Sequence, residues 1–151
     1  MIRQCDRKII LQDGTEFYGY GFGASGECTA EIVFNTSMVG YQEILSDPSY
    51  TGQAIVMTYP LIGNYGMCEE DYESLRPTAS AMIVREYNDK PSNFRASTTL
   101  GQVMEKNGII GIAGVDTRKL TKHIRDKGTC KVLITDAATS NLAAFAHLQS
   151  L

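Results

Sequence analysis

The sequence predicts a single α/β domain in which antiparallel strands come first and helix–strand alternation comes last. Residues 8–35 hold strand-like segments joined by short turns, and residues 97–135 alternate helical segments with apolar strands. The chain has 151 residues, 43% of them hydrophobic, which is enough to bury a core of its own.

The first third predicts an antiparallel β unit. Residues 8–11 form a short apolar strand. The Asp13-Gly14 pair that follows predicts a hairpin with a type I′ turn, which needs positive φ at its central residues. Residues 15–22, rich in Thr, Phe and Tyr, continue as the second strand. Residues 29–35 alternate apolar and polar side chains, as a strand with one buried face does.

The middle third predicts short elements separated by loops. A short helix over residues 41–46 ends before Pro48, because the residue preceding a proline disfavours the helical conformation. Apolar runs at 54–58 and 81–84 have the length of buried strands. Proline, glycine and asparagine mark residues 60–66 as a loop, and Pro91 lies in another over residues 90–96.

The last third predicts helices between strands. Ser97 or Thr98 caps a helix that is stopped by Gly108, and a strand over residues 109–115 follows. This strand, the next helix and the strand after it make a strand–helix–strand sequence with short connections, which usually joins parallel strands.

A second helix is predicted over residues 117–127, capped by Asp116 and stopped by Gly128, before a strand over residues 131–135. Residues 141–149 form a weaker final helix. The second helix is strongly basic, with Arg118, Lys119, Lys122, Arg125 and Lys127 against Asp116 and Asp126. Two interpretations stay open, an electrostatic docking face and a solvated surface.

Composition argues against several classes of protein. A net charge of −3 disfavours a nucleic-acid binder. The apolar runs are far shorter than the ~20 residues of a membrane span, and the start of the chain lacks a signal peptide's apolar stretch. The four cysteines form no CxxC pair, so we expect no zinc site and free thiols in the reducing cytoplasm. Residues 1–75 hold 3 bases and 11 acids whereas residues 76–151 hold 11 bases and 6 acids, an asymmetry that can mark a partner-facing surface.

Residues 21–26 spell a GxGxxG motif, with Gly21, Gly23 and Gly26 in the glycine positions. In a dinucleotide site these glycines join a strand to a helix whose N-terminus holds the pyrophosphate. A strand pattern follows the motif here. We therefore favour a tight loop between strands over a site for NAD or FAD.

A thiol hydrolase is the alternative from another class. It would use one of Cys5, Cys28, Cys68 and Cys130 with a histidine, His123 or His147. None of the four cysteines lies in a strand-to-helix elbow flanked by small residues. The sequence therefore favours binding over thiol catalysis.

Two loops have the composition of binding loops. Residues 35–50 and 58–66 mix small polar residues, glycine, proline and aromatics where no core periodicity applies. Ser49 and Tyr50 offer hydroxyls that both donate and accept hydrogen bonds. Neither loop contains a convincing acid–base pair or nucleophile, and packing between layers is the alternative role for both.

Five stretches in order along the chain give a specific resemblance. They are residues 11–15 (Leu-Gln-Asp-Gly-Thr), 34–50 (Phe-Asn-Thr-Ser-Met through Asp-Pro-Ser-Tyr), 58–64 (Thr-Tyr-Pro-Leu-Ile-Gly-Asn), 91–95 (Pro-Ser-Asn-Phe-Arg) and 112–121 (Ile-Ala-Gly-Val-Asp-Thr-Arg-Lys-Leu-Thr). Together they resemble the N-terminal domain of the small subunit of glutamine-dependent carbamoyl-phosphate synthase.

The resemblance implies a three-layered β/β/α domain over residues 1–135. Residues 136–151 are then a weakly matched tail or the start of a linker to an amidotransferase domain. In that family the amidotransferase domain releases ammonia from glutamine with a Cys-His-Glu triad. The large subunit consumes the ammonia in ATP- and Mg-dependent synthesis of carbamoyl phosphate, a ligase reaction that serves arginine and pyrimidine biosynthesis.

The resemblance also implies that this chain is a non-catalytic part of the enzyme. Its partners would be the large subunit, the amidotransferase domain of the same subunit and the substrate glutamine, with no nucleic acid and no membrane. We expect no catalytic residue, cofactor or metal in this domain. Ser49, in the Asp-Pro-Ser-Tyr motif, is the residue that the resemblance assigns to the glutamine pocket.

Overall fold

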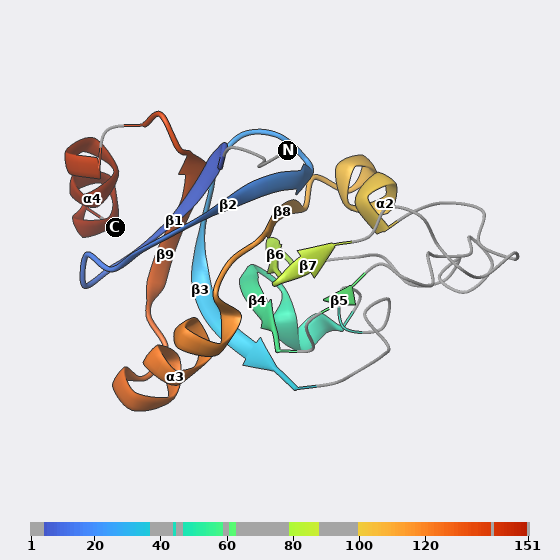
Figure 1. The fold of residues 1–151 in the computed structure, drawn as a ribbon, viewed down its shortest axis with the longest axis horizontal. Coiled ribbons are helices and arrows are strands. Elements are labelled where there is room, and N and C mark those ends of the chain that lie inside the picture. Colours follow the sequence, from blue (N-terminus) through green and yellow to red (C-terminus); the bar gives the residue numbers. More distant parts are fainter. Residues whose placement is uncertain are drawn as a thin grey trace, which may run out of the picture.

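A computed structural model describes residues 5–36, 44, 47–58, 61–62, 79–87, 100–139 and 141–150. Seven strands close into a barrel in the order β1-β2-β8-β6-β4-β3-β9, and β5 and β7 form a separate pair (Figure 1). The strands are β1 (Arg7–Leu11), β2 (Glu16–Gly23), β3 (Cys28–Asn35), β4 (Gln53–Met57), β5 (Leu61–Ile62), β6 (Ala81–Ile83), β7 (Glu86–Tyr87), β8 (Ile110–Ala113) and β9 (Lys131–Asp136). The helices are η1 (Pro48–Tyr50, a 3₁₀ turn), α2 (Leu100–Lys106), α3 (Thr117–Lys127) and α4 (Asn141–Gln149).

Four neighbouring strands of the barrel run in the same direction. β3 pairs in parallel with β4, β4 with β6, and β6 with β8. β9, β1 and β2 complete the barrel through antiparallel pairings. The carboxyl ends of the four parallel strands therefore meet at one end of the barrel.

The predicted α/β class, with an early antiparallel hairpin and a late βαβ segment, is confirmed. The parallel crossover runs from β6 through α2 to β8. The helix α3 differs, because it leads from β8 to β9, which pairs antiparallel to β1 and β3 and so runs opposite to β8. Although the connections on both sides of α3 are short, β8 and β9 are not neighbours in the barrel. The chain crosses the end of the barrel between these two strands.

Apolar side chains fill the barrel and also cover its outside. Ile9, Ile32 and Ile112 lie in the interior cluster, which is covered at one end by Leu120 and Ile124 of α3. Outside the barrel, α2 packs through Met104 among a second cluster that draws on β4, β6 and β8. Burial of apolar surface stabilises the folded state by about 25 cal/mol per Å². The two apolar clusters therefore stabilise the barrel.

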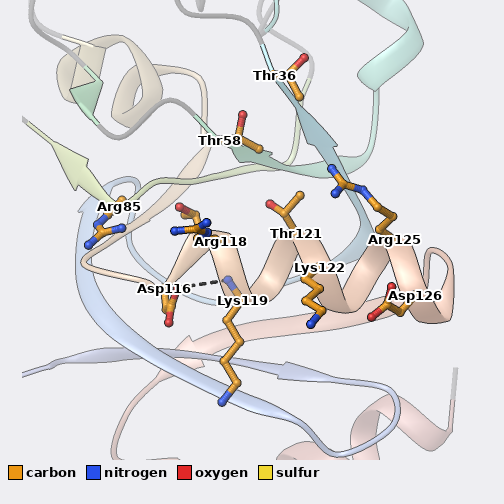
Figure 2. A pocket seen from close by; sticks show the side chains of 11 residues that line it. Thr36, Thr58, Arg85, Asp116, Arg118, Lys119, Thr121, Lys122, Arg125 and Asp126 are labelled. Atoms are coloured by element: carbon orange, nitrogen blue, oxygen red, sulfur yellow. Dashed lines mark hydrogen bonds between the residues drawn. The ribbon is translucent and has the colours of Figure 1, made fainter.

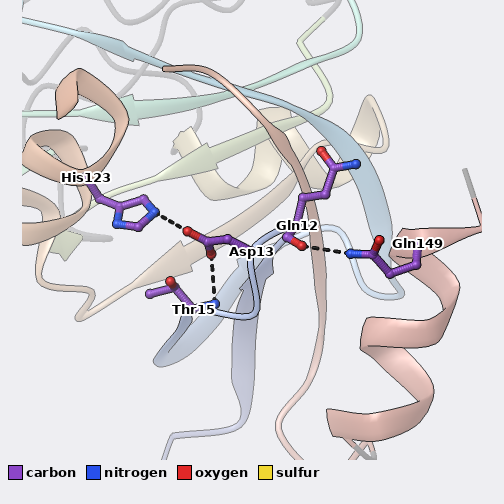
Figure 3. Close-up of polar contacts among 5 residues, drawn as sticks. All are labelled: Gln12, Asp13, Thr15, His123 and Gln149. Carbon is purple, nitrogen blue, oxygen red and sulfur yellow. Dashed lines mark hydrogen bonds and ion pairs between the residues drawn. The ribbon is translucent and has the colours of Figure 1, made fainter. Parts of the chain in front are cut away.

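The first hairpin is present, but its turn differs from the predicted type I′. Among the described residues only glycines have positive φ, and here Gly14 alone does so, at 93°. Asp13 instead accepts a hydrogen bond from the backbone N–H of Thr15, at 3.0 Å (Figure 3). The Asx turn therefore reverses the chain with one residue of positive φ, whereas the predicted type I′ turn needs two.

Several predicted features lie outside the described residues. These are the loops at 60–66 and 90–96, apart from residues 61–62, together with the Ser97 or Thr98 cap, Cys68 and the helix at 41–46, of which Ile44 alone is described. Ile44 is helical and buried.

Candidate functional site

A groove with a volume of about 850 Å³ lies beyond the carboxyl ends of the parallel strands (Figure 2). Thr36 follows β3, Thr58 follows β4, and Arg85 lies two residues after β6. Asp116 follows the end of β8 and begins the helix α3, which forms the opposite wall. Ligands of α/β folds commonly bind at the carboxyl ends of parallel strands, because the loops after these strands converge there. We refer to this cavity as the basic groove.

The helix α3 is held in place by local signals at both ends. Asp116 accepts a hydrogen bond from the backbone N–H of Lys119 at 3.1 Å, which is an N-cap. At the other end the N–H of Gly128 donates to the carbonyl of Ile124 at 2.7 Å. Leu120 and Ile124 are buried against the barrel core, so the rest of the helix is left to face the groove and the surface.

Cationic side chains dominate the walls of the basic groove. The described residues of its lining include five cations and two acids, which are Arg85, Arg118, Lys119, Lys122, Arg125, Asp116 and Asp126. The guanidinium of Arg125 lies over the Phe34 ring, 5.6 Å from its centre, which is a cation–π contact. Within the described parts of the chain, none of these five cations forms an ion pair. The described lining of the groove therefore carries a net positive charge, although the chain as a whole is acidic.

Four threonine side chains add hydrogen-bonding capacity to the basic groove. Thr36 and Thr58 come from the strand ends (Figure 2), and Thr117 and Thr121 come from α3. Thr58 Oγ1 donates to the carbonyl of Asn35 at 3.2 Å. Thr121 is 7% exposed, and its Oγ1 has no hydrogen-bond partner among the described residues.

Ser49 lies on the exposed turn η1, next to the groove. Asp47 caps this turn by accepting from the Ser49 N–H at 2.9 Å, and it also accepts from Ser49 Oγ at 2.8 Å. These two hydrogen bonds hold the pKa of Asp47 below its ordinary value. The Ser49 side chain is therefore exposed but held in one direction.

Asn35 connects the Ser49 turn to the basic groove. Its side-chain amide donates to the hydroxyl of Tyr50 at 2.9 Å, while its carbonyl accepts from the N–H of Thr58 at 3.1 Å. The loops predicted to bind, residues 35–50 and 58–66, thus supply both parts of the site through their described residues. Arg85 and Thr121 were missed, because no pattern along the chain shows that they face the same cavity.

The thiols of Cys28 and Cys130 are not arranged for nucleophilic catalysis. Burial raises the pKa of Cys28. Burial is also the main cause that raises the pKa of Cys130, and the carboxylates of Asp13 and Glu31 raise it further. A backbone hydrogen bond from Gln12 lowers this pKa, but by less. A reactive thiol needs a lowered pKa instead.

The described histidine is engaged elsewhere. His123 Nε2 lies 2.7 Å from Asp13 Oδ2, which links α3 to the first hairpin (Figure 3). Cys5 is exposed near the start of the chain, and the side chains of Cys68 and His147 lie outside the described set. The predicted alternative of a thiol hydrolase has no support in this geometry.

Two glycines of the GxGxxG motif, Gly21 and Gly23, are required by the geometry of the barrel. A Cβ on Gly21 would lie 2.7 Å from the guanidinium carbon of Arg7, and Gly23 has a φ of +71°. Gly21 thus makes room for the Arg7 side chain, which donates to the Gly111 carbonyl at 2.6 Å. The strand β3 follows the motif, so the helix N-terminus that would hold a pyrophosphate is missing.

The described residues contain no group of three or more His, Cys, Asp or Glu side chains placed to hold a metal ion. None of their helices is long and apolar enough to cross a membrane.

Comparison with known proteins gives consistent matches. The family model described as "Carbamoyl-phosphate synthase small chain, CPSase domain" matches residues 9–134. The carbamoyl phosphate synthase small chain of Fusobacterium nucleatum subsp. nucleatum is 55% identical over 126 residues, covering 83% of this chain and 35% of that protein. The small chain of Bacillus caldolyticus is 50% identical over 145 residues, covering 96% of this chain and 40% of that protein. This chain thus spans well under half the length of either relative.

A solved structure also resembles the fold. An aminopeptidase from Aneurinibacillus sp. strain AM-1 superposes with a TM-score of 0.50 at 17% identity, over 89% of this chain and 30% of that chain. At this identity the likeness concerns the fold alone.

Proposed function

Because this chain belongs to the family of carbamoyl-phosphate synthase small chains, we propose that it is the non-catalytic N-terminal part of such a small chain. In this role it docks the large chain of the synthase and completes the pocket for glutamine. Ammonia released from glutamine then serves ATP-dependent synthesis of carbamoyl phosphate on the large chain, which holds ATP and Mg. The pathways served are arginine and pyrimidine biosynthesis, in the cytoplasm.

The position of Ser49 is the observation that carries the glutamine part of this proposal. Its hydroxyl hydrogen is directed to Asp47 at 2.8 Å, so its oxygen is left with acceptor capacity toward solvent. A glutamine molecule offers N–H donors on its ammonium group and its side-chain amide. We infer that Ser49 accepts a hydrogen bond from one of these groups, with Asp47 fixing the direction of the hydroxyl.

The raised pKa values of two thiols support a division of labour. Both Cys28 and Cys130 have raised pKa values, so neither supplies a thiolate near neutral pH. We assign the chemistry that releases ammonia to the part of the small chain that follows the matched region in the longer relatives. This chain then contributes binding and assembly.

A chimera tests both parts of the proposal. This chain replaces the matching part of the Fusobacterium nucleatum small chain, and the product is mixed with the large chain of the same organism. We expect the two chains to co-elute on size exclusion and to use glutamine. Failure of the chimera to bind the large chain, while the native small chain binds, would contradict the docking role.

The substitution Ser49→Ala in that chimera tests the glutamine pocket. The loss of one hydrogen bond, about 0.5–1.5 kcal/mol net, is expected to raise the apparent KM for glutamine roughly 2- to 13-fold. Synthesis with free ammonia should not change, because that substrate bypasses the pocket. Ser25→Ala is the matched control, since Ser25 is an exposed serine that precedes β3 and so lies at the other end of the barrel. An unchanged KM for glutamine would remove Ser49 from the pocket.

A further inference from the structure

We propose that the basic groove is a binding site for the phosphate group of a small soluble ligand. Ser49 does not line this groove, and the inference is independent of the glutamine pocket. Three observations carry it: the uncompensated charge of the groove, the orphaned hydroxyl of Thr121 and the shape of the cavity.

The charge of the groove is uncompensated within the described residues. Arg85 reaches it from the loop after β6, whereas Arg118 and Arg125 reach it from positions about two turns apart on α3. None of the three forms an ion pair there. Asp116, one of the two acids in the lining, is occupied as the N-cap of α3. Cations brought together without partners repel one another, and an anion bound between them removes that cost.

The orphaned hydroxyl of Thr121 points to a missing partner. Its oxygen is buried and has no hydrogen-bond partner among the described residues, although most buried polar side-chain atoms are hydrogen-bonded. Figure 2 shows the Thr121 side chain on the side of α3 that faces Thr58, between Arg118 and Arg125. An anionic oxygen placed in the groove would accept its O–H hydrogen. This is the same place where the cations favour negative charge.

The size of the groove and its donor groups suit a phosphate group. Its volume of about 850 Å³ falls in the range of small-molecule sites, and it opens to solvent between strand ends and a helix. Guanidinium groups match a phosphate with two parallel N–H donors each, and Arg125 is held for this by its contact with Phe34. Thr36 and Thr58 place further hydroxyls at the strand ends. A tetrahedral anion with up to two charges can use these donors from several directions at once.

Titration with inorganic phosphate tests the site. Binding to this chain is followed by calorimetry at constant ionic strength, with potassium chloride as the reference salt. We expect saturable binding and a rise of the melting temperature beyond that given by chloride, because a ligand selective for the native state stabilises it. The double variant Arg118→Gln/Arg125→Gln should bind phosphate at least about tenfold more weakly. Lys127→Gln is the matched control, since Lys127 is an exposed cation on α3 that does not line the groove.

The substitution Thr121→Val tests whether Thr121 binds the phosphate or has only a structural role. Without phosphate the variant should melt at a higher temperature, because it removes a buried hydroxyl that has no partner. With phosphate its affinity should fall about tenfold, because the hydrogen bond to a charged group is lost. Thr129→Val, at an exposed position after α3, should change neither quantity.

Three results would overturn the proposal. The first is a rise of the melting temperature with phosphate that is no larger than the rise with chloride. The second is an equal affinity for phosphate in the double arginine variant and in Lys127→Gln. Should the double variant fail to fold by circular dichroism, Arg85→Gln, in a loop, provides the same comparison. The third is phosphate binding by the free chain that disappears in the chimera bound to the large chain, since a protein surface would then fill the groove. All three leave the Ser49 experiment unaffected.

Discussion

At the scale of single residues, Asp13 is the side chain that joins distant parts of the chain. It accepts from the Thr15 N–H within its own turn and meets His123 from α3 at 2.7 Å. Burial raises the pKa of Asp13, but the hydrogen bonds from Thr15 and His123 together outweigh it, and the pKa lies below its ordinary value of 3.8. The charged form is therefore the one that the folded state favours.

This shift predicts a pH dependence of stability. A carboxyl group with a lowered folded pKa stabilises the protein fully above its unfolded pKa and loses that contribution as the pH falls through the folded value. The difference in unfolding free energy between the wild type and Asp13→Asn should thus shrink as the pH falls from about 6 to below about 3.8. Urea unfolding across this range measures it. A gap that stays constant with pH would show that Asp13 acts through packing or turn geometry.

Residue-scale prediction from the sequence depended on whether the signal was local. Ser49 was singled out from its own loop and motif, whereas the Asp47 cap was not predicted, although an Asp-Pro-Ser sequence forms a turn without help from the rest of the chain. The orphaned Thr121 hydroxyl could not be predicted, because helix periodicity places Thr121 beside the apolar stripe but does not show what lies opposite.

At the scale of elements, α3 was predicted with the bounds it has, because both of its ends carry local signals. Its direction across the barrel was not predicted, since that depends on which strands pair, and those pairings involve residues far apart in sequence. The final helix shows the same limit. Its existence was expected, but its contact with the outside of β1 and β9 is visible only in the structure (Figure 1).

The N-cap of α3 gives a prediction at this scale. Asp116→Ala removes the acceptor for the Lys119 N–H and should lower the unfolding free energy by about 1 kcal/mol. Asp126→Ala, at an exposed position in the last turn of the same helix, should cost less because that residue caps nothing. Chemical denaturation of both variants makes the comparison, and equal losses would refute a capping role for Asp116.

At the scale of the whole molecule, closure of the barrel brings the two ends of the described chain together. β1 pairs with β9 along its full length, from Arg7 opposite Asp136 to Leu11 opposite Val132. The helix α4 then packs over this pair through Ala144 and Leu148, against Ile10 and Leu133. The sequence predicted each strand of the barrel, but not β5, which lies in the predicted loop at 60–66, and not β7. Barrel closure also requires register between strands that no local pattern encodes.

The α4 contact predicts that the tail contributes to the stability of the barrel. Leu148 is fully buried, and Leu148→Ala should cost about 2–5 kcal/mol of unfolding free energy. Leu142, on the same helix, is 81% exposed, so Leu142→Ala should be nearly neutral. Thermal and urea unfolding of the two variants distinguish them. Similar, small losses in both would mean that α4 is detached in solution.

The pairing of β1 with β9 also bears on how this domain meets other proteins. A sheet with open sides offers rows of unpaired N–H and C=O groups to which a foreign strand can add, and a closed ring of seven strands offers none. A foreign strand therefore cannot add to the barrel through main-chain hydrogen bonds, either in productive assembly or in aggregation. What the barrel presents to a partner is its side chains, its covering helices and the loops at its two rims.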